Sequence, residues 1–226
     1  MIETASGLVF RTRLLTETSL IVHWLTPNFG RLATVAKGAR RANSPFRGKL
    51  DLFYLADLSF SRSPRSELHT LREVSLRETH RALRQDLGLL HQASYCVALI
   101  ERATETETPL PQVFDLMVGL LRHLLSFPPQ PQTIFSFELK LLADLGLMPD
   151  LARSQLNSGT RQLVKALTEE DWPVTTHLKP SPEQFRELRL FLHGFLQDHL
   201  GRVLNARAPA LGETPLRKPF APASSL

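Results

Sequence analysis

The sequence has a single cysteine, Cys96, among its 226 residues. One thiol excludes an intrachain disulfide and a four-cysteine zinc site, so we expect a protein of a reducing compartment. The helical pattern around Cys96 predicts a buried structural thiol rather than a reactive one. The sequence also lacks a signal-peptide pattern and any apolar run of about 18 residues, which predicts a cytoplasmic protein without a membrane span.

Catalytic sequence motifs are absent as well. The chain contains no phosphate-binding P-loop, no dinucleotide-binding glycine motif, no nucleophile elbow and no HExxH zinc motif. Its eight histidines are scattered, and His193 and His199 are spaced to lie on opposite faces of one expected helix. We therefore expect no enzyme, with no catalytic residue, no metal and no cofactor. A metal-dependent nuclease of unrecognised type stays open as the alternative, because carboxylates distant in sequence can converge after folding.

Acidic residues are missing from residues 18–50, a stretch that holds six basic ones. Residues 1–80 carry a net charge of +5, and the remainder of the chain carries none. Charge confined to one part of a chain creates a local potential that attracts a polyanion, and nucleic acid is the first candidate. A plain solvated loop is one alternative, and an anionic membrane surface is a weaker one, since no amphipathic helix carries these residues. The DNA-binding candidates are Lys37, Arg40 and Arg41 first, then Arg31, Arg47 and Lys49.

The hydrophobic pattern is typical of strands in the first third of the chain and of helices in the rest, which predicts an α+β protein. Up to about residue 76, segments rich in β-branched, aromatic and leucine residues alternate with turn signals, which predicts short strands. The expected strands are 7–13, 19–25, 31–36, 52–61 and 67–76. Spacing this tight leaves no room for crossover helices, so we expect an antiparallel sheet, closed as a five-stranded OB-type barrel in a domain of residues 1–79. An SH3-like barrel is the alternative.

From residue 80 the hydrophobic period becomes helical and predicts an all-α domain of residues 80–207. One helix should end near Thr104, the next should begin at Pro111, and a third should occupy 132–145. A capping box that begins at Ser181 predicts the start of a long fourth helix. Prolines and small residues in 208–226 predict a flexible tail.

The order of these features resembles the bacterial RecO family of DNA repair proteins, which are recombination mediators. An opening strand ends in Arg11-Thr12-Arg13, and Val35-Ala36-Lys37-Gly38-Ala39-Arg40-Arg41 is similar to the family's most distinctive N-terminal signature. The run from Phe137 to Pro149 is similar to its second signature. The resemblance covers residues 1–150 clearly and 180–205 loosely.

One departure from the family pattern falls just after the second signature. Many members carry a four-cysteine zinc site there, whereas this chain has Ser154 and Asn157 at the first pair of positions and no later cysteine pair. The chain therefore resembles a zinc-less variant, with residues 150–180 as a degenerate zinc segment without cysteines.

The resemblance implies a binding protein rather than an enzyme. Family members bind single- and double-stranded DNA, anneal complementary strands, contact the acidic C-terminal tail of single-strand-binding protein (SSB), and act with RecR to load the recombinase RecA onto SSB-coated gaps, which implies association with the nucleoid. An SSB tail needs an apolar pocket rimmed by cations, for which Arg122 and Lys140 of the helical region are candidates unless they only occupy solvent faces. OB barrels also stack bases on aromatic residues, although half or more of those in this barrel should be core. They are Trp24, Phe29, Phe46, Phe53, Tyr54 and Phe60. A protein-interaction scaffold with a basic barrel is a further alternative.

Overall fold

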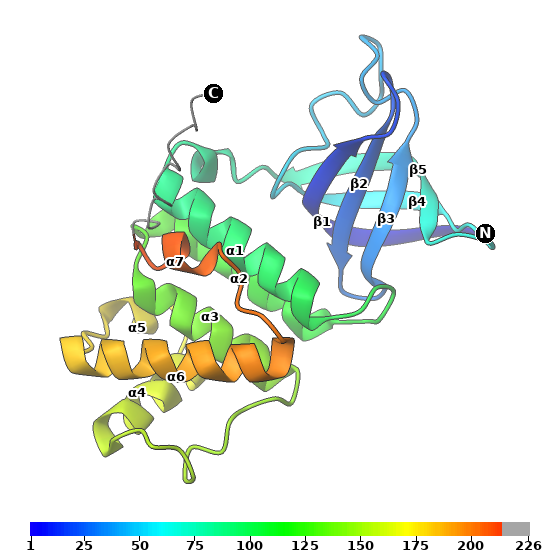
Figure 1. Cartoon of the computed structure of the whole chain (residues 1–226). Coiled ribbons are helices and arrows are strands. Elements are labelled where there is room, and N and C mark those ends of the chain that lie inside the picture. The colour runs from blue at the N-terminus through cyan, green and yellow to red at the C-terminus, as the bar shows by residue number, and fades with distance from the viewer. Residues whose placement is uncertain (214–226) are drawn as a thin grey trace, which may run out of the picture.

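The computed structural model describes residues 1–213, and it shows a β-barrel followed by a group of helices (Figure 1). This α+β architecture confirms the predicted fold class. The five strands lie in the order β1-β2-β3-β5-β4 and close into a barrel, the arrangement of the OB fold. Their bounds are β1 (Ile2–Leu14), β2 (Leu20–Thr26), β3 (Gly30–Ala36), β4 (Leu55–Ser61) and β5 (Leu68–Glu78).

One strand pair differs from the expected antiparallel sheet. Ala33 to Val35 of β3 pair in parallel with Leu68 to Thr70 of β5, whereas the other four pairs in the ring are antiparallel. The reason is geometric, because a closed ring with an odd number of strands cannot alternate direction at every step. The long connection between β3 and β4, residues 37–54, contains five of the six candidate cations.

The turn between β2 and β3 forms as the sequence predicts. Gly30 has φ of 60°, a conformation that favours glycine, and the Thr26 hydroxyl donates to its carbonyl oxygen over 2.9 Å. A Cβ at this position would lie 1.8 Å from the carbonyl oxygen of Thr108. The turn is therefore pressed against the helical part of the chain.

The barrel has two apolar surfaces because its strands alternate. Its interior contains Trp24, whose indole donates to Thr34 over 2.9 Å. Leu8, Phe10 and Leu25 point the other way and belong to a continuous core with the helices. The barrel and the helical region therefore pack together through a shared core.

The first three predicted helices are present close to their expected bounds. The capping box at Ser181 is also present, and it begins the long fourth helix as predicted. Two helices lie in the degenerate zinc segment and were not predicted at these bounds. The helices within residues 1–213 are η1 (Arg81–Arg84), α1 (Leu87–Ala103), α2 (Pro111–Ser126), α3 (Pro131–Asp144), α4 (Ser158–Glu169), α5 (Trp172–His177), α6 (Pro182–Leu200) and α7 (Arg207–Ala210).

The start of the expected flexible tail needs correction. Residues 207–213 include the short helix α7 and return to the core, where Ala210 and Leu211 are buried. The Arg207 guanidinium donates to both carboxylate oxygens of Glu138, over 2.7 and 2.9 Å. This ion pair anchors the segment, and composition alone could not indicate it. The rest of the expected tail, 214–226, lies outside the described residues.

Two other expectations concern burial and membranes. Cys96 is fully buried, as predicted, and burial raises the pKa of its thiol well above the ordinary value. Between residues 1 and 213, no helix is both long and apolar enough to cross a membrane.

Candidate nucleic-acid interface

The cations singled out by the sequence lie mainly in residues 37–49, here called the basic loop. It follows β3 and lies beside the turn between β1 and β2, at the top of Figure 1. The backbone N–H of Gly38 donates to the Ser19 hydroxyl over 3.2 Å, and that of Arg40 donates to the Thr18 carbonyl over 3.0 Å. These bonds fix the start of the loop to the neighbouring hairpin.

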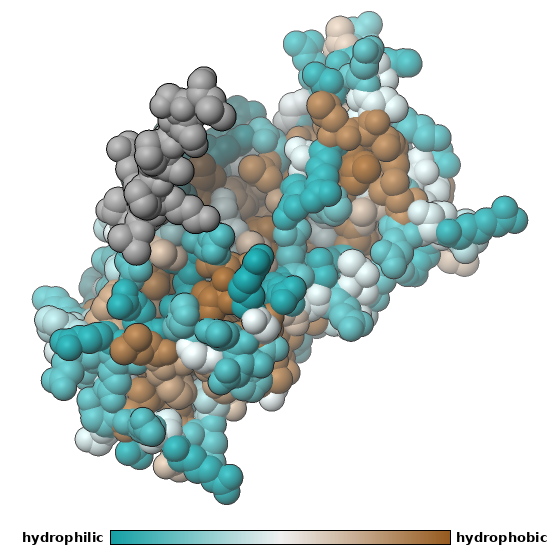
Figure 2. Space-filling model, in the orientation of Figure 1, coloured by the Kyte–Doolittle hydropathy of each residue, from teal (hydrophilic) through white to brown (hydrophobic). Residues whose placement is uncertain are grey.

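Four loop cations are exposed to solvent. Arg40 donates to the carbonyl oxygen of Glu17 over 2.8 Å and Arg47 donates to that of Ala42 over 3.2 Å. Carbonyl groups orient a guanidinium without cancelling its charge. Among residues 1–213, none of the four pairs with a carboxylate, so the loop presents uncompensated positive charge in a region that Figure 2 shows as mainly hydrophilic. They are Lys37, Arg40, Arg41 and Arg47.

The remaining two candidates are engaged elsewhere. Arg31 lies at the opposite end of β3, where it donates to the hydroxyl and carbonyl oxygens of Thr104 over 2.9 and 2.5 Å. Burial lowers the pKa of Arg31, and the nearby Glu101 opposes that shift. Lys49 is half-buried and donates to the Val74 carbonyl oxygen over 3.1 Å. Arg31 therefore belongs to the joint between barrel and helices, whereas Lys49 stays at the edge of the basic loop.

The β2–β3 face, with which OB folds commonly bind oligonucleotides, is partly covered. The segment after α1 contacts it. The N–H of Glu107 donates to the Arg31 carbonyl oxygen over 2.8 Å, and the N–H of Leu110 donates to the Pro27 carbonyl oxygen over 3.1 Å. Arg11 of β1 forms an ion pair with Glu101. The cavity that remains measures about 120 Å³.

The barrel aromatics are mostly core residues. Among the six stacking candidates, Phe29 alone is half-buried, and the other five are buried. An aromatic stacking platform, which the resemblance implied as one mode of binding, is therefore not displayed on this barrel.

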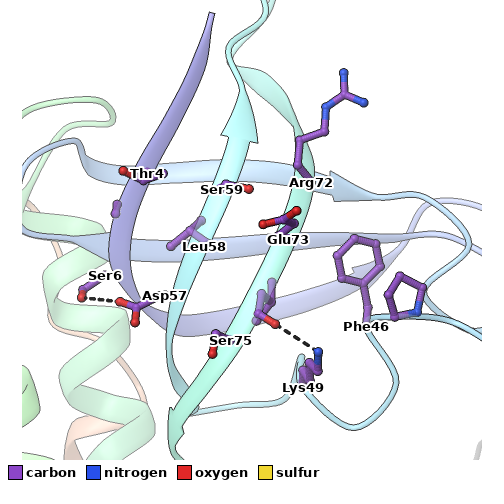
Figure 3. A pocket seen from close by; sticks show the side chains of 13 residues that line it. Thr4, Ser6, Phe46, Lys49, Asp57, Leu58, Ser59, Arg72, Glu73 and Ser75 are labelled. Atoms are coloured by element: carbon purple, nitrogen blue, oxygen red, sulfur yellow. Dashed lines mark hydrogen bonds between the residues drawn. The ribbon is translucent and has the colours of Figure 1, made fainter.

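A groove of about 670 Å³ lies on the outer surface of β1, β4 and β5. Figure 3 shows Phe46 of the basic loop beside the outward side chains of these strands. The lining is mixed. Apolar side chains such as Leu58 and Val74 lie beside polar ones, the Ser6 hydroxyl donates to Asp57 over 3.0 Å, and Lys49 also lines the groove. Sequence reasoning missed the groove because three strands and a loop supply its lining, and only folding brings them together.

Arg122 and Lys140, the two candidate contacts for the SSB tail, both have partners within the fold. Arg122 of α2 pairs with Glu78 of β5, over 2.5 and 3.2 Å, and this contact holds the pKa of Glu78 below its ordinary value. The Lys140 ammonium donates to the carbonyl oxygens of Thr168 and Glu170 at the C-terminal end of α4, over 2.9 and 2.6 Å. Burial lowers the pKa of Lys140. Each cation therefore joins two parts of the fold.

Ser154 and Asn157, the residues that the resemblance places where many family members have cysteines, form structural hydrogen bonds. The Ser154 hydroxyl donates to the Leu151 carbonyl oxygen over 2.8 Å. The Asn157 side chain caps α4 by accepting from the N–H of Thr160 over 2.8 Å, and it donates to Glu187 over 2.6 Å. In the described part of the chain, no group of three histidine, cysteine or acidic residues is arranged to hold a metal ion.

Comparison with known proteins matches both halves of the fold to one family. Residues 1–80 match the family model described as Recombination protein O N terminal, and residues 84–155 match Recombination protein O C terminal. A DNA repair protein RecO from Bacillus pumilus is 32% identical over 151 residues, which cover 67% of this chain and 58% of that protein. The RecO of Rhodopirellula baltica is also 32% identical, over 54% of its length. The chain thus matches little more than half of these two relatives.

A longer match comes from Anaeromyxobacter dehalogenans strain 2CP-C. Its DNA repair protein RecO is 30% identical over an alignment that covers 89% of this chain and 93% of that protein.

Proposed function

The chain belongs to the RecO family and has a role in DNA repair, and on that premise we propose that it is a DNA-binding recombination mediator rather than an enzyme. The observation that carries the proposal is the exposed basic loop, whose four cations have no carboxylate partner within the described residues. Such a loop suits the phosphates of single- and double-stranded DNA alike. We further propose residues 1–79 as the DNA-binding domain and the helical region, which the structure extends to residue 213, as the partner-binding domain of a cytoplasmic, nucleoid-associated protein.

Backbone contacts of this kind also suit strand annealing. Cations that neutralise phosphates reduce the repulsion between two strands, and they leave the base edges free to pair. The finer role that we propose is annealing of complementary strands and, together with RecR, loading of the recombinase on SSB-coated gaps.

The proposal is tested by fluorescence anisotropy of a labelled single-stranded oligonucleotide at several salt concentrations. Four phosphate contacts with a slope of about 0.7 each predict that affinity falls roughly 50-fold between about 50 and 200 mM salt. Affinity that is absent at low salt, or that does not change with salt, would contradict the proposal. Cleavage of the oligonucleotide upon addition of magnesium would instead favour the nuclease alternative.

We also propose that the helical region captures the acidic SSB tail, with Arg122 as the contact. The Arg122 side chain is 58% exposed, so a tail carboxylate can reach it in competition with Glu78. Fluorescence polarisation of a labelled tail peptide should show about tenfold weaker binding for Arg122→Ala, or about 1.4 kcal/mol.

Two further substitutions distinguish a specific Arg122 contact from a general effect of charge. Glu78→Gln removes the competing carboxylate and should strengthen peptide binding, whereas Arg186→Ala removes an exposed cation of α6 and should change little. Equal losses in both arginine variants would reject Arg122 as the specific contact.

A further inference from the structure

The basic loop encloses a hollow of about 440 Å³ next to its exposed cations. Its lining includes Phe46, which is 7% exposed and packs in the barrel core. Three arginines also line it, and no carboxylate lies among the lining residues. We call the apolar lining side chains the floor and the arginines the rim. The floor comprises Leu20, Ala39, Ala42, Phe46 and Leu50, and the rim comprises Arg40, Arg41 and Arg47.

This combination suits a ligand that places an apolar surface beside anionic groups. A guanidinium has five N–H donors, and the structure gives Arg40 one bond to the Glu17 carbonyl oxygen and Arg47 one bond to that of Ala42. Donors therefore remain for phosphate oxygens. The floor side chains carry no polar atom, so an apolar face packs favourably against them.

Double-stranded DNA presents phosphates but keeps its base faces stacked. A single strand presents both, because an unstacked base exposes its face next to its own phosphate. Elsewhere on the barrel, the aromatic candidates other than the half-buried Phe29 are buried, and the β2–β3 face is partly covered by the segment that follows α1. The hollow is where an apolar floor and unpaired cations occur together.

We propose that this hollow receives one unstacked base of single-stranded DNA while the flanking phosphates bind the rim arginines. The inference rests on the proposed function, since it requires the basic loop to bind DNA. It adds a preference for unpaired over paired strands, because a duplex must open before a base can enter.

The test compares three oligonucleotides of equal length: a normal single strand, the same strand with abasic sites, and a duplex. The abasic strand keeps every phosphate but offers no base, so its affinity should be about fivefold lower with an unchanged salt slope. A variant with Leu20→Gln and Leu50→Gln keeps the rim arginines and should lose this difference. Leu190→Gln, at an exposed leucine of α6, is the matched control and should retain it.

A measurement on the unmodified protein covers the case in which the double variant does not fold. A 2-aminopurine in the single strand should brighten upon binding, because its fluorescence is quenched by stacking. Equal affinity for normal and abasic strands, or unchanged 2-aminopurine fluorescence, would overturn the base site while leaving phosphate binding intact. Absence of salt-dependent binding to any oligonucleotide would overturn the proposed function itself. The double variant could instead lose binding of the acidic SSB tail peptide and keep the difference in affinity between the normal and the abasic strand. That result would overturn the base site and reassign the hollow to a protein partner.

Discussion

Replacement of Lys37, Arg40 and Arg41 by alanine should weaken single-stranded DNA binding by roughly 50-fold near 0.15 M salt and lower the salt slope by about 2. Each lost phosphate contact removes the release of about 0.7 counterion, so three contacts act on affinity and slope together. Both quantities come from the same anisotropy titration. Because the contacts are with phosphate, the loss should be similar for unrelated oligonucleotide sequences.

The fold should tolerate this change. All three side chains are exposed, and the Arg40 guanidinium donates only to a backbone group, the carbonyl oxygen of Glu17, among the described residues. Surface substitutions of this kind usually alter stability by about 0.5 kcal/mol or less each. The matched control replaces Lys165, Lys179 and Arg186, which are exposed cations of the helical region, and should change affinity by less than about twofold. Similar losses in both triple variants would mean that net charge, and not the basic loop, governs binding.

The sequence predicted the basic loop but not which cations share its surface. Arg31 and Lys37 both belong to the acid-free stretch, yet Arg31 is the second residue of β3 and Lys37 follows its last residue, and a strand rises about 3.3 Å per residue. They consequently lie at opposite ends of the barrel, and Arg31 contacts Thr104 instead of solvent. The density of charge along the sequence does not show which cations share a surface. The strand that separates them must also be taken into account.

Most elements were predictable where local signals agree with the tertiary structure. The turn at Gly30 and the capping box at Ser181 each satisfy backbone groups locally, so the sequence alone indicates them. The parallel β3–β5 pair and the hollow in the basic loop depend on ring closure and on contacts between distant segments. No local pattern encodes such features.

Arg207→Met should lower the free energy of unfolding by about 3–5 kcal/mol, the largest stability effect we expect from a single substitution in this chain. The Arg207 side chain is 4% exposed, and its partner Glu138 is fully buried. Loss of the guanidinium leaves the carboxylate without its counter-charge, with one remaining bond of 2.5 Å from the Tyr95 hydroxyl. Burial by itself lowers the pKa of Arg207, but the Glu138 contact raises it above the ordinary range, so the arginine stays charged at any pH compatible with folding.

The cause of this loss can be isolated with a second arginine from the same region. Arg189 pairs with Glu213 over 2.5 Å, but both side chains are more than one third exposed. Arg189→Met should therefore cost no more than about 1 kcal/mol, since solvent screens the pair. Urea denaturation of both variants, and of Arg207→Met combined with Glu138→Leu, measures the difference.

The double variant decides between an unpaired charge and lost packing. Removal of both charges should recover most of the stability, because the penalty of a broken buried pair comes mainly from the charge left behind. If the double variant is as unstable as the single one, then Arg207 stabilises the fold through packing of α7 and not through its charge. In either case a large loss requires that residues 207–213 form part of the folded core, because a flexible tail that begins at residue 208 would leave Arg207 free to move into water and Glu138 without a partner.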